Sequence, residues 1–286
     1  MQIGVALPAT VPGTDGRRIT TWARDADRYG FSTLGVLDRL VYDNYEPLTA
    51  LAAAAAVTER IGLATTVLTT PYRNNTPLLA KQLASVDRMS GGRLTLGVAA
   101  GNRPDDFEVS GVPHAERGRL LDDQLSELAR IWRDGKDGAA LAPAPRAGAP
   151  AGLPLILGGT SDAAFRRAAA VGKGWIAGGS SPSGFQANAE RVRAAWARAG
   201  RTDRPHLMTL LYFSLGPRGP RQARDYLLDY YAFSGRAESV VGMAFTDPER
   251  LRTAVEEYGT AGCDEIVFVP CGSGPEQLEL LADAVF

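Results

Sequence analysis

The segment from Arg60 to Gly101 constrains the fold of this chain most strongly. It contains an apolar run, a polar turn, an amphipathic run, a Gly-Gly turn and a second apolar run that ends on small residues. Short apolar runs without alternation indicate strands buried on both faces, and the run between them has the period of a helix. The segment predicts a strand–helix–strand unit of a parallel sheet, whose carboxyl edge offers ligand-sized room. This arrangement is more typical of an enzyme than of a binding module.

The same alternation continues along the whole chain. The expected strands are Ile3–Leu7, Thr33–Leu37, Ile61–Leu68, Leu94–Ala99, Leu153–Leu157, Gly174–Ala177, Leu207–Ser214 and Glu265–Val269. The expected helices are Arg18–Tyr29, Pro47–Thr58, Thr76–Met89, Arg117–Arg133, Ser161–Val171, Ser183–Ala199, Pro220–Phe233, Pro248–Tyr258 and Pro275–Ala284.

Eight strands alternating with helices predict an α/β fold, a single (β/α)8 TIM barrel over residues 1–286. The length of 286 residues fits such a barrel, which typically needs roughly 250. A G-x-G-x-x-G motif is absent after the first strand, which argues against a dinucleotide-binding sheet. Two stretches interrupt the pattern without marking a domain boundary. We expect a surface loop at Gly135–Gly152 and a loop with a short helix near the barrel mouth at Ser234–Thr246.

Composition excludes several classes of partner. The formal net charge of −1 gives no electrostatic reason to bind nucleic acid or an anionic membrane. No apolar run approaches the roughly 20 residues of a membrane span, and the N-terminus lacks the basic lead-in of a signal peptide. Cys263 and Cys271 fit neither a disulfide framework nor a zinc site, so we expect ordinary thiols and a cytoplasmic protein.

Small and hydroxyl residues dominate the expected carboxyl ends of the strands. Only Asp38, Arg39 and Arg103 carry charge there, and no cluster of metal-ligating side chains occurs. His114 and His206 are far apart in sequence, and we expect each to be structural or exposed. Such a site suits an organic cofactor that carries the demanding chemistry itself.

Two glycine turns are candidate cofactor contacts. Gly158, Gly159, Thr160 and Ser161 follow a strand and open a helix, where free amides attract a phosphate, although a simple capped turn would have the same sequence. Gly178 and Gly179 follow the next strand. Arg117 begins a long helix and suits anion contact or plain exposure equally. Asp38 and Arg39 either orient a cofactor ring or pair with each other.

The run LAKQLASVDRMSGGRLTLGVAAGNRPDDFEVSGVPHAERGRLLDDQL resembles the luciferase-like flavin monooxygenase family. This family includes alkanesulfonate monooxygenases and deazaflavin-dependent reductases and dehydrogenases. IGVALP, STLGVLDR and GGTSDAAFRRAAAVGKGWIAGG add to the likeness, which covers nearly the whole chain. The resemblance implies a barrel, usually a homodimer, that binds FMN or a deazaflavin at its C-terminal mouth.

The resemblance also implies site residues. A non-prolyl cis peptide supports the flavin ring in many members, and the matching bond joins Thr66 and Val67. Gly101 and Asn102 match a position that faces flavin or substrate. The implied cofactor contacts are Arg117, Gly158, Gly159, Thr160, Ser161, Gly178 and Gly179.

The chain departs from its relatives in its proton-handling groups. Many relatives have a histidine where this chain has Arg39, and a guanidinium does not deprotonate in a protein. Bacterial luciferases have an arginine phosphate ligand at Ala100, and some deazaflavin-dependent alcohol dehydrogenases have a glutamate at Asn102. No long insertion offers a lid, so we expect an open pocket.

Three hypotheses follow. The first is a monooxygenase in which reduced FMN, supplied by a separate flavin reductase, reacts with O2 and oxidises a small organic substrate. Asp38, Arg39 and Asn102 would then be the catalytic residues. The second is hydride transfer by the deazaflavin coenzyme F-420, and the third is a flavin-binding protein without turnover. The aromatics expected near the pocket are Tyr42, Tyr45, Tyr72, Phe107, Tyr212 and Phe213.

Overall fold

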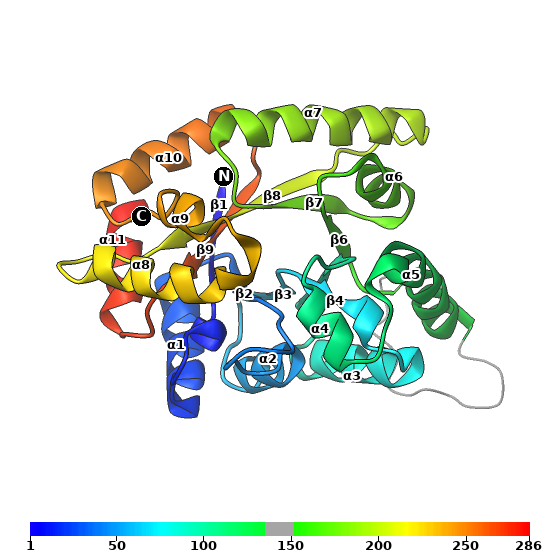
Figure 1. Ribbon diagram of the computed structural model, residues 1–286, viewed down its shortest axis with the longest axis horizontal. Helices are drawn as coiled ribbons and strands as arrows, with labels where there is room; N and C mark the ends of the chain where they lie inside the picture. The colour runs from blue at the N-terminus through cyan, green and yellow to red at the C-terminus, as the bar shows by residue number, and fades with distance from the viewer. Residues whose placement is uncertain (135–151) are drawn as a thin grey trace.

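The computed structural model describes residues 1–134 and 152–286, so the expected loop at Gly135–Gly152 falls almost wholly outside the described residues. Strands occupy the middle of the molecule and helices surround them (Figure 1). The strands are β1 (Gln2–Ala6), β2 (Thr33–Val36), β3 (Gly62–Thr65), β4 (Leu68–Thr69), β5 (Leu94–Ala99), β6 (Leu155–Gly158), β7 (Gly174–Gly178), β8 (His206–Phe213) and β9 (Glu265–Pro270).

The strands form one parallel sheet that closes on itself. Their order is β3-β2-β1-β9-β8-β7-β6-β5-β4, and β3 also pairs with β5. Because β3 and β4 share one position against β5, the result is a closed eight-stranded (β/α)8 barrel, as predicted.

The helices begin and end close to the predicted residues. They are α1 (Gly16–Tyr29), α2 (Pro47–Ala55), α3 (Thr76–Met89), α4 (Pro104–Val109), α5 (Arg117–Asp134), α6 (Asp162–Val171), α7 (Pro182–Arg198), α8 (Gly219–Tyr230), α9 (Ala237–Val241), α10 (Pro248–Thr260) and α11 (Glu276–Val285). The short helix α4 was not predicted. The short helix expected within Ser234–Thr246 is α9.

The third strand differs from the prediction of one continuous run over Ile61–Leu68. It is broken into β3 and β4 at Thr66 and Val67, whose peptide bond is cis as the resemblance implied. The reason lies in the neighbouring strands. Thr66 turns toward β2, where its backbone N–H and its hydroxyl both donate to the Val36 carbonyl, at 2.8 and 3.1 Å. On the other side, a Cβ at Gly97 would lie 2.0 Å from the Thr65 carbonyl oxygen, so β5 needs glycine there.

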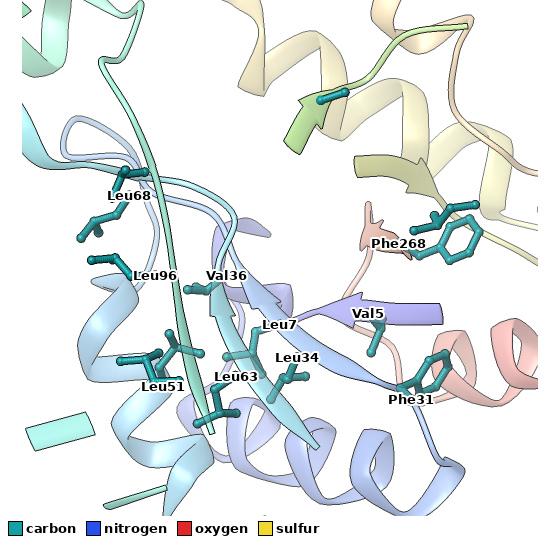
Figure 2. Packing of buried hydrophobic residues seen from close by; sticks show 14 of the residues in the cluster. Val5, Leu7, Phe31, Leu34, Val36, Leu51, Leu63, Leu68, Leu96 and Phe268 are labelled. Atoms are coloured by element: carbon teal, nitrogen blue, oxygen red, sulfur yellow. The ribbon is translucent and has the colours of Figure 1, made fainter. Parts of the chain in front are cut away.

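Two buried clusters stabilise the barrel. The larger lies between the sheet and the helices, where Leu34, Leu51 and Leu63 pack together (Figure 2). The smaller includes side chains from alternate positions of the strands, among them Ile156, Ile176 and Met208, and extends to tyrosines of α8. In the first cluster, apolar faces of the helices pack against the sheet. The second cluster lies beneath the mouth of the barrel.

A buried carboxylate joins three strands near the amino ends of β8 and β9. Glu265 accepts a hydrogen bond from Ser32 at 2.6 Å and bonds His206 Nε2 at 3.0 Å. Burial by itself raises the pKa of the Glu265 carboxyl, but the bonds from His206, Ser32 and Thr33 together hold that pKa below its ordinary value. The carboxylate therefore stabilises the fold above the unfolded-state pKa of about 4.3, and the contribution is lost as pH falls through the lower folded-state value.

We expect Glu265→Gln to lower the free energy of unfolding by about 1–3 kcal/mol at pH 7. The gap from the wild type should shrink below about pH 4, where the wild-type carboxyl becomes protonated too. Urea unfolding at several pH values measures this gap, with exposed Glu256→Gln as the control. A gap that does not change with pH would contradict this account of Glu265.

Candidate cofactor-binding site

A cavity of about 540 Å³ lies at the carboxyl ends of the strands. Its walls come from the segments that follow β2, β5, β6 and β7, and from the break between β3 and β4. The predicted site residues that line it are Asp38, Thr66, Val67, Gly101, Asn102, Arg117, Gly158, Gly159, Thr160, Ser161, Gly178 and Gly179. Residues far apart in sequence thus meet at one mouth, where barrels of this kind place their chemistry.

The turn after β6 presents backbone to the cavity. Gly159 has φ of 111°, a conformation that L side chains rarely adopt. Trp175 Nε1 donates to the Gly159 carbonyl at 2.7 Å and fixes the turn. Ser161 caps α6 by accepting from the Ala164 N–H at 3.2 Å. The turn and the first amides of a ten-residue helix are suited to an anion.

The turn after β7 supplies room and a polar group. A Cβ added to Gly178 would meet no atom within 4 Å, so its hydrogen faces open space. Ser180 follows, and its hydroxyl is buried without a hydrogen-bond partner among the described residues. Ser181 then caps α7 by accepting from the Gly184 N–H at 3.1 Å. A second helix N-terminus therefore lies beside the first.

Two arginines contribute to this side of the cavity. Arg117 is half-buried and donates to the His114 carbonyl at 2.8 Å, and among the described residues it has no ion pair. Arg167, which sequence reasoning missed, is paired with Asp122 at 2.6 Å. Of these two arginines, Arg117 is the one without an ion pair, and its contact with an anion stays a prediction.

Asp38 faces the cavity but is fully occupied by protein partners. Its carboxylate accepts from the Tyr72 hydroxyl at 2.6 Å, the Thr69 N–H at 2.8 Å and Arg73 Nη2 at 3.0 Å. Burial raises the pKa of the Asp38 carboxyl above its ordinary value, and the contacts with Arg73, Tyr72 and Thr69 offset only part of that rise. Asp38 thus fixes β4 and the turn that follows, next to the cis peptide at the cavity wall.

Arg39 takes neither of the two roles that sequence suggested. It is not among the residues that line the cavity, and it does not pair with Asp38. Its buried guanidinium binds Asp106 at 3.0 Å and Asp105 at 2.8 Å, both on α4. The reason is that α4, which was not predicted, brings two carboxylates against the loop after β2. Arg39 therefore anchors α4, and the expectation that it orients a ring or substrate at this wall is wrong in this geometry.

Several cavity residues were not assigned from sequence. Arg103, Tyr231 and Phe233 meet at the mouth beside the predicted Asn102, and the two aromatics were expected to belong to a helix ending at Phe233. Instead α8 ends at Tyr230 and a 3₁₀ turn follows, which brings the aromatics over the cavity. Of the aromatics expected near the pocket, Phe107 and Tyr212 line it. The cavity wall does not include the other four aromatics that were expected there, Tyr42, Tyr45, Tyr72 and Phe213.

A second chamber of about 1140 Å³ adjoins the first. The residues that line both are Asn102, Gly178, Gly179, Leu210, Tyr212, Tyr231 and Phe233. Its other walls come from α9, α10 and the start of α7. A ligand in the first cavity is therefore reachable from the second.

The remaining candidates carry no chemistry at this mouth. Within residues 1–134 and 152–286, no group of three or more His, Cys, Asp or Glu is placed to hold a metal. Burial raises the pKa of the Cys263 thiol to about 12, so it stays protonated. His206 bonds Glu265 at the opposite end of β8, and His114 packs edge-on against Phe107, with ring centroids 5.0 Å apart. Both histidines are thus structural, as expected. No helix in the described part of the chain is long and apolar enough to cross a membrane.

A parallel barrel with two glycine turns, two helix N-termini and an available arginine around one cavity defines a (β/α)8 protein with a candidate ligand site at its mouth. The family model described as "luciferase-like monooxygenase" matches residues 1–277, and the chain belongs to that family. An uncharacterized protein of Mycobacterium tuberculosis is 30% identical over 213 residues, which cover 63% of this chain and 72% of that protein. A 5,10-methylenetetrahydromethanopterin reductase of Archaeoglobus fulgidus is 26% identical over 225 residues, 75% of this chain and 64% of the reductase.

Solved structures agree with the fold over the whole chain. An F420-dependent secondary alcohol dehydrogenase in complex with an F420-acetone adduct superposes with a TM-score of 0.83 at 17% identity, covering 99% of this chain and 98% of that one. The oxygenating constituent of 3,6-diketocamphane monooxygenase from Pseudomonas putida, in complex with FMN, gives 0.76 at 16% identity, covering 100% and 98%. At these identities the likeness concerns the fold alone.

Proposed function

We propose that this chain is an oxidoreductase that binds a flavin-type coenzyme in the mouth cavity and uses it to oxidise or reduce a small organic substrate. The observation that carries the proposal is the cavity wall itself. It combines open backbone at Gly178, an anion-binding turn over Gly158–Ser161 and the available Arg117. A ligand with a phosphate at one end and a flat ring at the other fits this combination.

The residues present divide between the two ends of such a coenzyme. Arg117 and the amides of Gly158–Ser161 would hold the phosphate, with Gly178 and Gly179 beside the chain that leads to the ring. Thr66 and Val67 would support the ring, with Asn102 facing it or the substrate. The coenzyme, when bound, supplies the electron-transfer chemistry. Asp38 keeps the supporting segment in place through its bond to Thr69.

Two observations favour hydride transfer with a deazaflavin of the F-420 type over oxygen chemistry. The mouth cavity shares part of its wall with a larger second chamber, an arrangement less suited to the water-excluding site that oxygen chemistry on a reduced flavin requires. A relative with a named activity is a reductase that acts on methylenetetrahydromethanopterin.

The second candidate is monooxygenation with reduced FMN and O2. The description of the family as luciferase-like monooxygenases and the FMN complex of a neighbour in fold favour it. In that case a separate flavin reductase would supply reduced FMN. A homodimer, which is usual among the proteins this chain resembles, belongs to either proposal.

Titration of the purified protein separates the candidates. Cofactor F-420, oxidised FMN and, without oxygen, reduced FMN are each followed by a change in their own fluorescence or absorption. We expect micromolar or tighter binding of F-420. Preferential binding of reduced FMN would support the monooxygenase instead, and binding without any substrate-dependent turnover would support a flavin-binding protein. No binding of any of the three would refute the proposed function.

Arg117→Gln should weaken coenzyme binding by about 10- to 100-fold, because it removes a charge-assisted bond to the phosphate. The loss should be smaller at high salt, since screening already weakens this interaction in the wild type. Arg119→Gln is the matched control on the same helix, because Arg119 pairs with Asp123 and Glu116 at the surface. Equal losses in the two variants would contradict the role assigned to Arg117.

A further inference from the structure

Arg103 is a buried cation at the junction of the two chambers. It is the fourth residue after β5, at the start of α4, and only 9% of the residue is exposed. Its guanidinium carbon lies 3.9 Å from the ring centroid of Phe233 and 4.4 Å from that of Tyr230. The aromatic rings hold the side chain in place and partly stabilise its charge.

The carboxylates of Asp38 and Asp106, which line the mouth cavity with Arg103, and of Asp105 on α4 are each paired with an arginine other than Arg103. Asp38 binds Arg73 at 3.0 Å. Asp105 and Asp106 bind Arg39 at 2.8 and 3.0 Å. Among the described residues, no carboxylate lies within 4.0 Å of the Arg103 guanidinium. Burying a cation without a counter-ion costs free energy. Such a residue is therefore unusual unless a ligand supplies the missing negative charge.

The hydrogen bonds of Arg103 are equally incomplete. A guanidinium carries five N–H groups. Within the described part of the chain, the Arg103 side chain makes one hydrogen bond, from Nη1 to the Tyr230 carbonyl at 3.1 Å. Its nitrogens are not among the side-chain atoms sealed from solvent without a partner, and the residue lines the mouth cavity. The unused N–H groups are therefore open to a ligand in that cavity.

The position of Arg103 separates it from the proposed phosphate contacts. Its partners Tyr230 and Phe233 belong to α8 and the turn after it, whereas the proposed phosphate contacts come from α5 and the turn after β6. Asn102, immediately before it, lines both chambers, as do Tyr231 and Phe233. Arg103 thus lies where a substrate passing from the second chamber would meet the coenzyme cavity.

We propose that Arg103 binds a carboxylate of the substrate, so that the protein acts on small organic acids. This inference rests on the proposed function, because it assigns the phosphate end of the cavity to a coenzyme. A guanidinium and a carboxylate match as planar, bidentate partners, which gives the substrate both affinity and orientation. The aromatic walls beside Arg103 accommodate the apolar part of such an acid.

Calorimetry with matched acids and amides tests this inference. Benzoate is compared with benzamide, and phenylacetate with phenylacetamide, on the protein with and without its bound coenzyme. We expect each acid to bind about 10- to 100-fold more tightly than its amide. Arg103→Gln should abolish the preference while leaving the affinity for the amides unchanged. Arg103→Lys should retain part of the preference, because it keeps the charge without the planar fork.

Arg236→Gln serves as the control, because Arg236 is an exposed arginine of the second chamber, and it should leave the preference intact. Equal affinity for acid and amide in the wild type, no binding of either acid, or a preference that survives Arg103→Gln would each overturn the inference. Weaker coenzyme binding by Arg103→Gln without a change in acid preference would also overturn it, and would assign Arg103 to the coenzyme. Failure of the wild type to bind any coenzyme refutes the proposed function instead, and is measured separately.

Discussion

Gly178→Leu should reduce coenzyme affinity by about 100-fold or more while the protein remains folded. A Cβ at Gly178 would meet no protein atom within 4 Å, and its φ is not in the left-handed region, so the side chain has room in the protein. Gly178 lines both the mouth cavity and the second chamber, so the new side chain would occupy space that a ligand needs. We therefore expect the melting temperature to change little and the binding measured by F-420 or FMN fluorescence to be lost.

Two comparisons make this result specific. Ala187→Leu adds a similar side chain to the exposed surface of α7 and should leave binding unchanged. Gly174→Ala lies at the other end of β7, where a Cβ would be 2.0 Å from the His206 carbonyl, and it should destabilise the fold. Normal coenzyme binding by a folded Gly178→Leu variant would mean that the ligand occupies another part of the molecule.

Asp38→Asn should lower the free energy of unfolding by about 3 kcal/mol. The side chain of Asp38 is fully buried and accepts three hydrogen bonds, and that of its partner Arg73 is only 18% exposed. Asparagine removes the negative charge and turns an N–H₂ group toward one of the donors. Glu46, which also pairs with Arg73 at 3.0 Å, limits the loss. Urea unfolding measures the change.

Asp105→Asn is the matched control for this buried pair. The Asp105 side chain is 38% exposed, and Arg39 keeps its second partner Asp106. Its effect should stay below about 1 kcal/mol, as for exposed pairs. Coenzyme affinity of Asp38→Asn should also fall, because Thr69 and the neighbouring break between β3 and β4 lose the hydrogen bond that holds them in place. Equal stability of the two variants would contradict the structural role of Asp38.

The barrel was predictable because each strand is an apolar run between turn residues, and each helix has its own period. The break in the third strand was not visible in those terms, because GLATTVLT continues with apolar residues and threonines after its first glycine. The strand is interrupted where Thr66 donates two hydrogen bonds to the Val36 carbonyl, a contact between residues far apart in sequence. The resemblance of the chain to a known family, rather than its periodicity, located the cis bond.

The candidate site was predictable where backbone shape matters and not where charge pairing matters. Gly158 and Gly178 follow strands, and strand ends converge in a closed barrel, so their meeting follows from topology. The partners of Asp38 and Arg39 do not, because they come from Arg73 and from α4, which is too short to show a helical period. The turn that brings Phe233 over the mouth was missed because α8 reads as one continuous helix with it.

The departure at Arg39 has a chemical consequence. A guanidinium does not deprotonate in a protein, so Arg39 cannot act as a general acid or base, and here it donates to Asp105, Asp106 and the Val41 carbonyl. In this geometry Arg39 is therefore a structural residue that anchors α4.

The most direct measurement is a crystal structure of the protein with the coenzyme that it binds. The account predicts that the phosphate lies within hydrogen-bond distance of the amides of Gly158–Ser161 and of Arg117. It also predicts that the ring lies against Thr66 and Val67, with Gly178 beside the chain between them. A coenzyme bound elsewhere, or bound in this cavity with its phosphate remote from Arg117 and the turn after β6, would contradict the account.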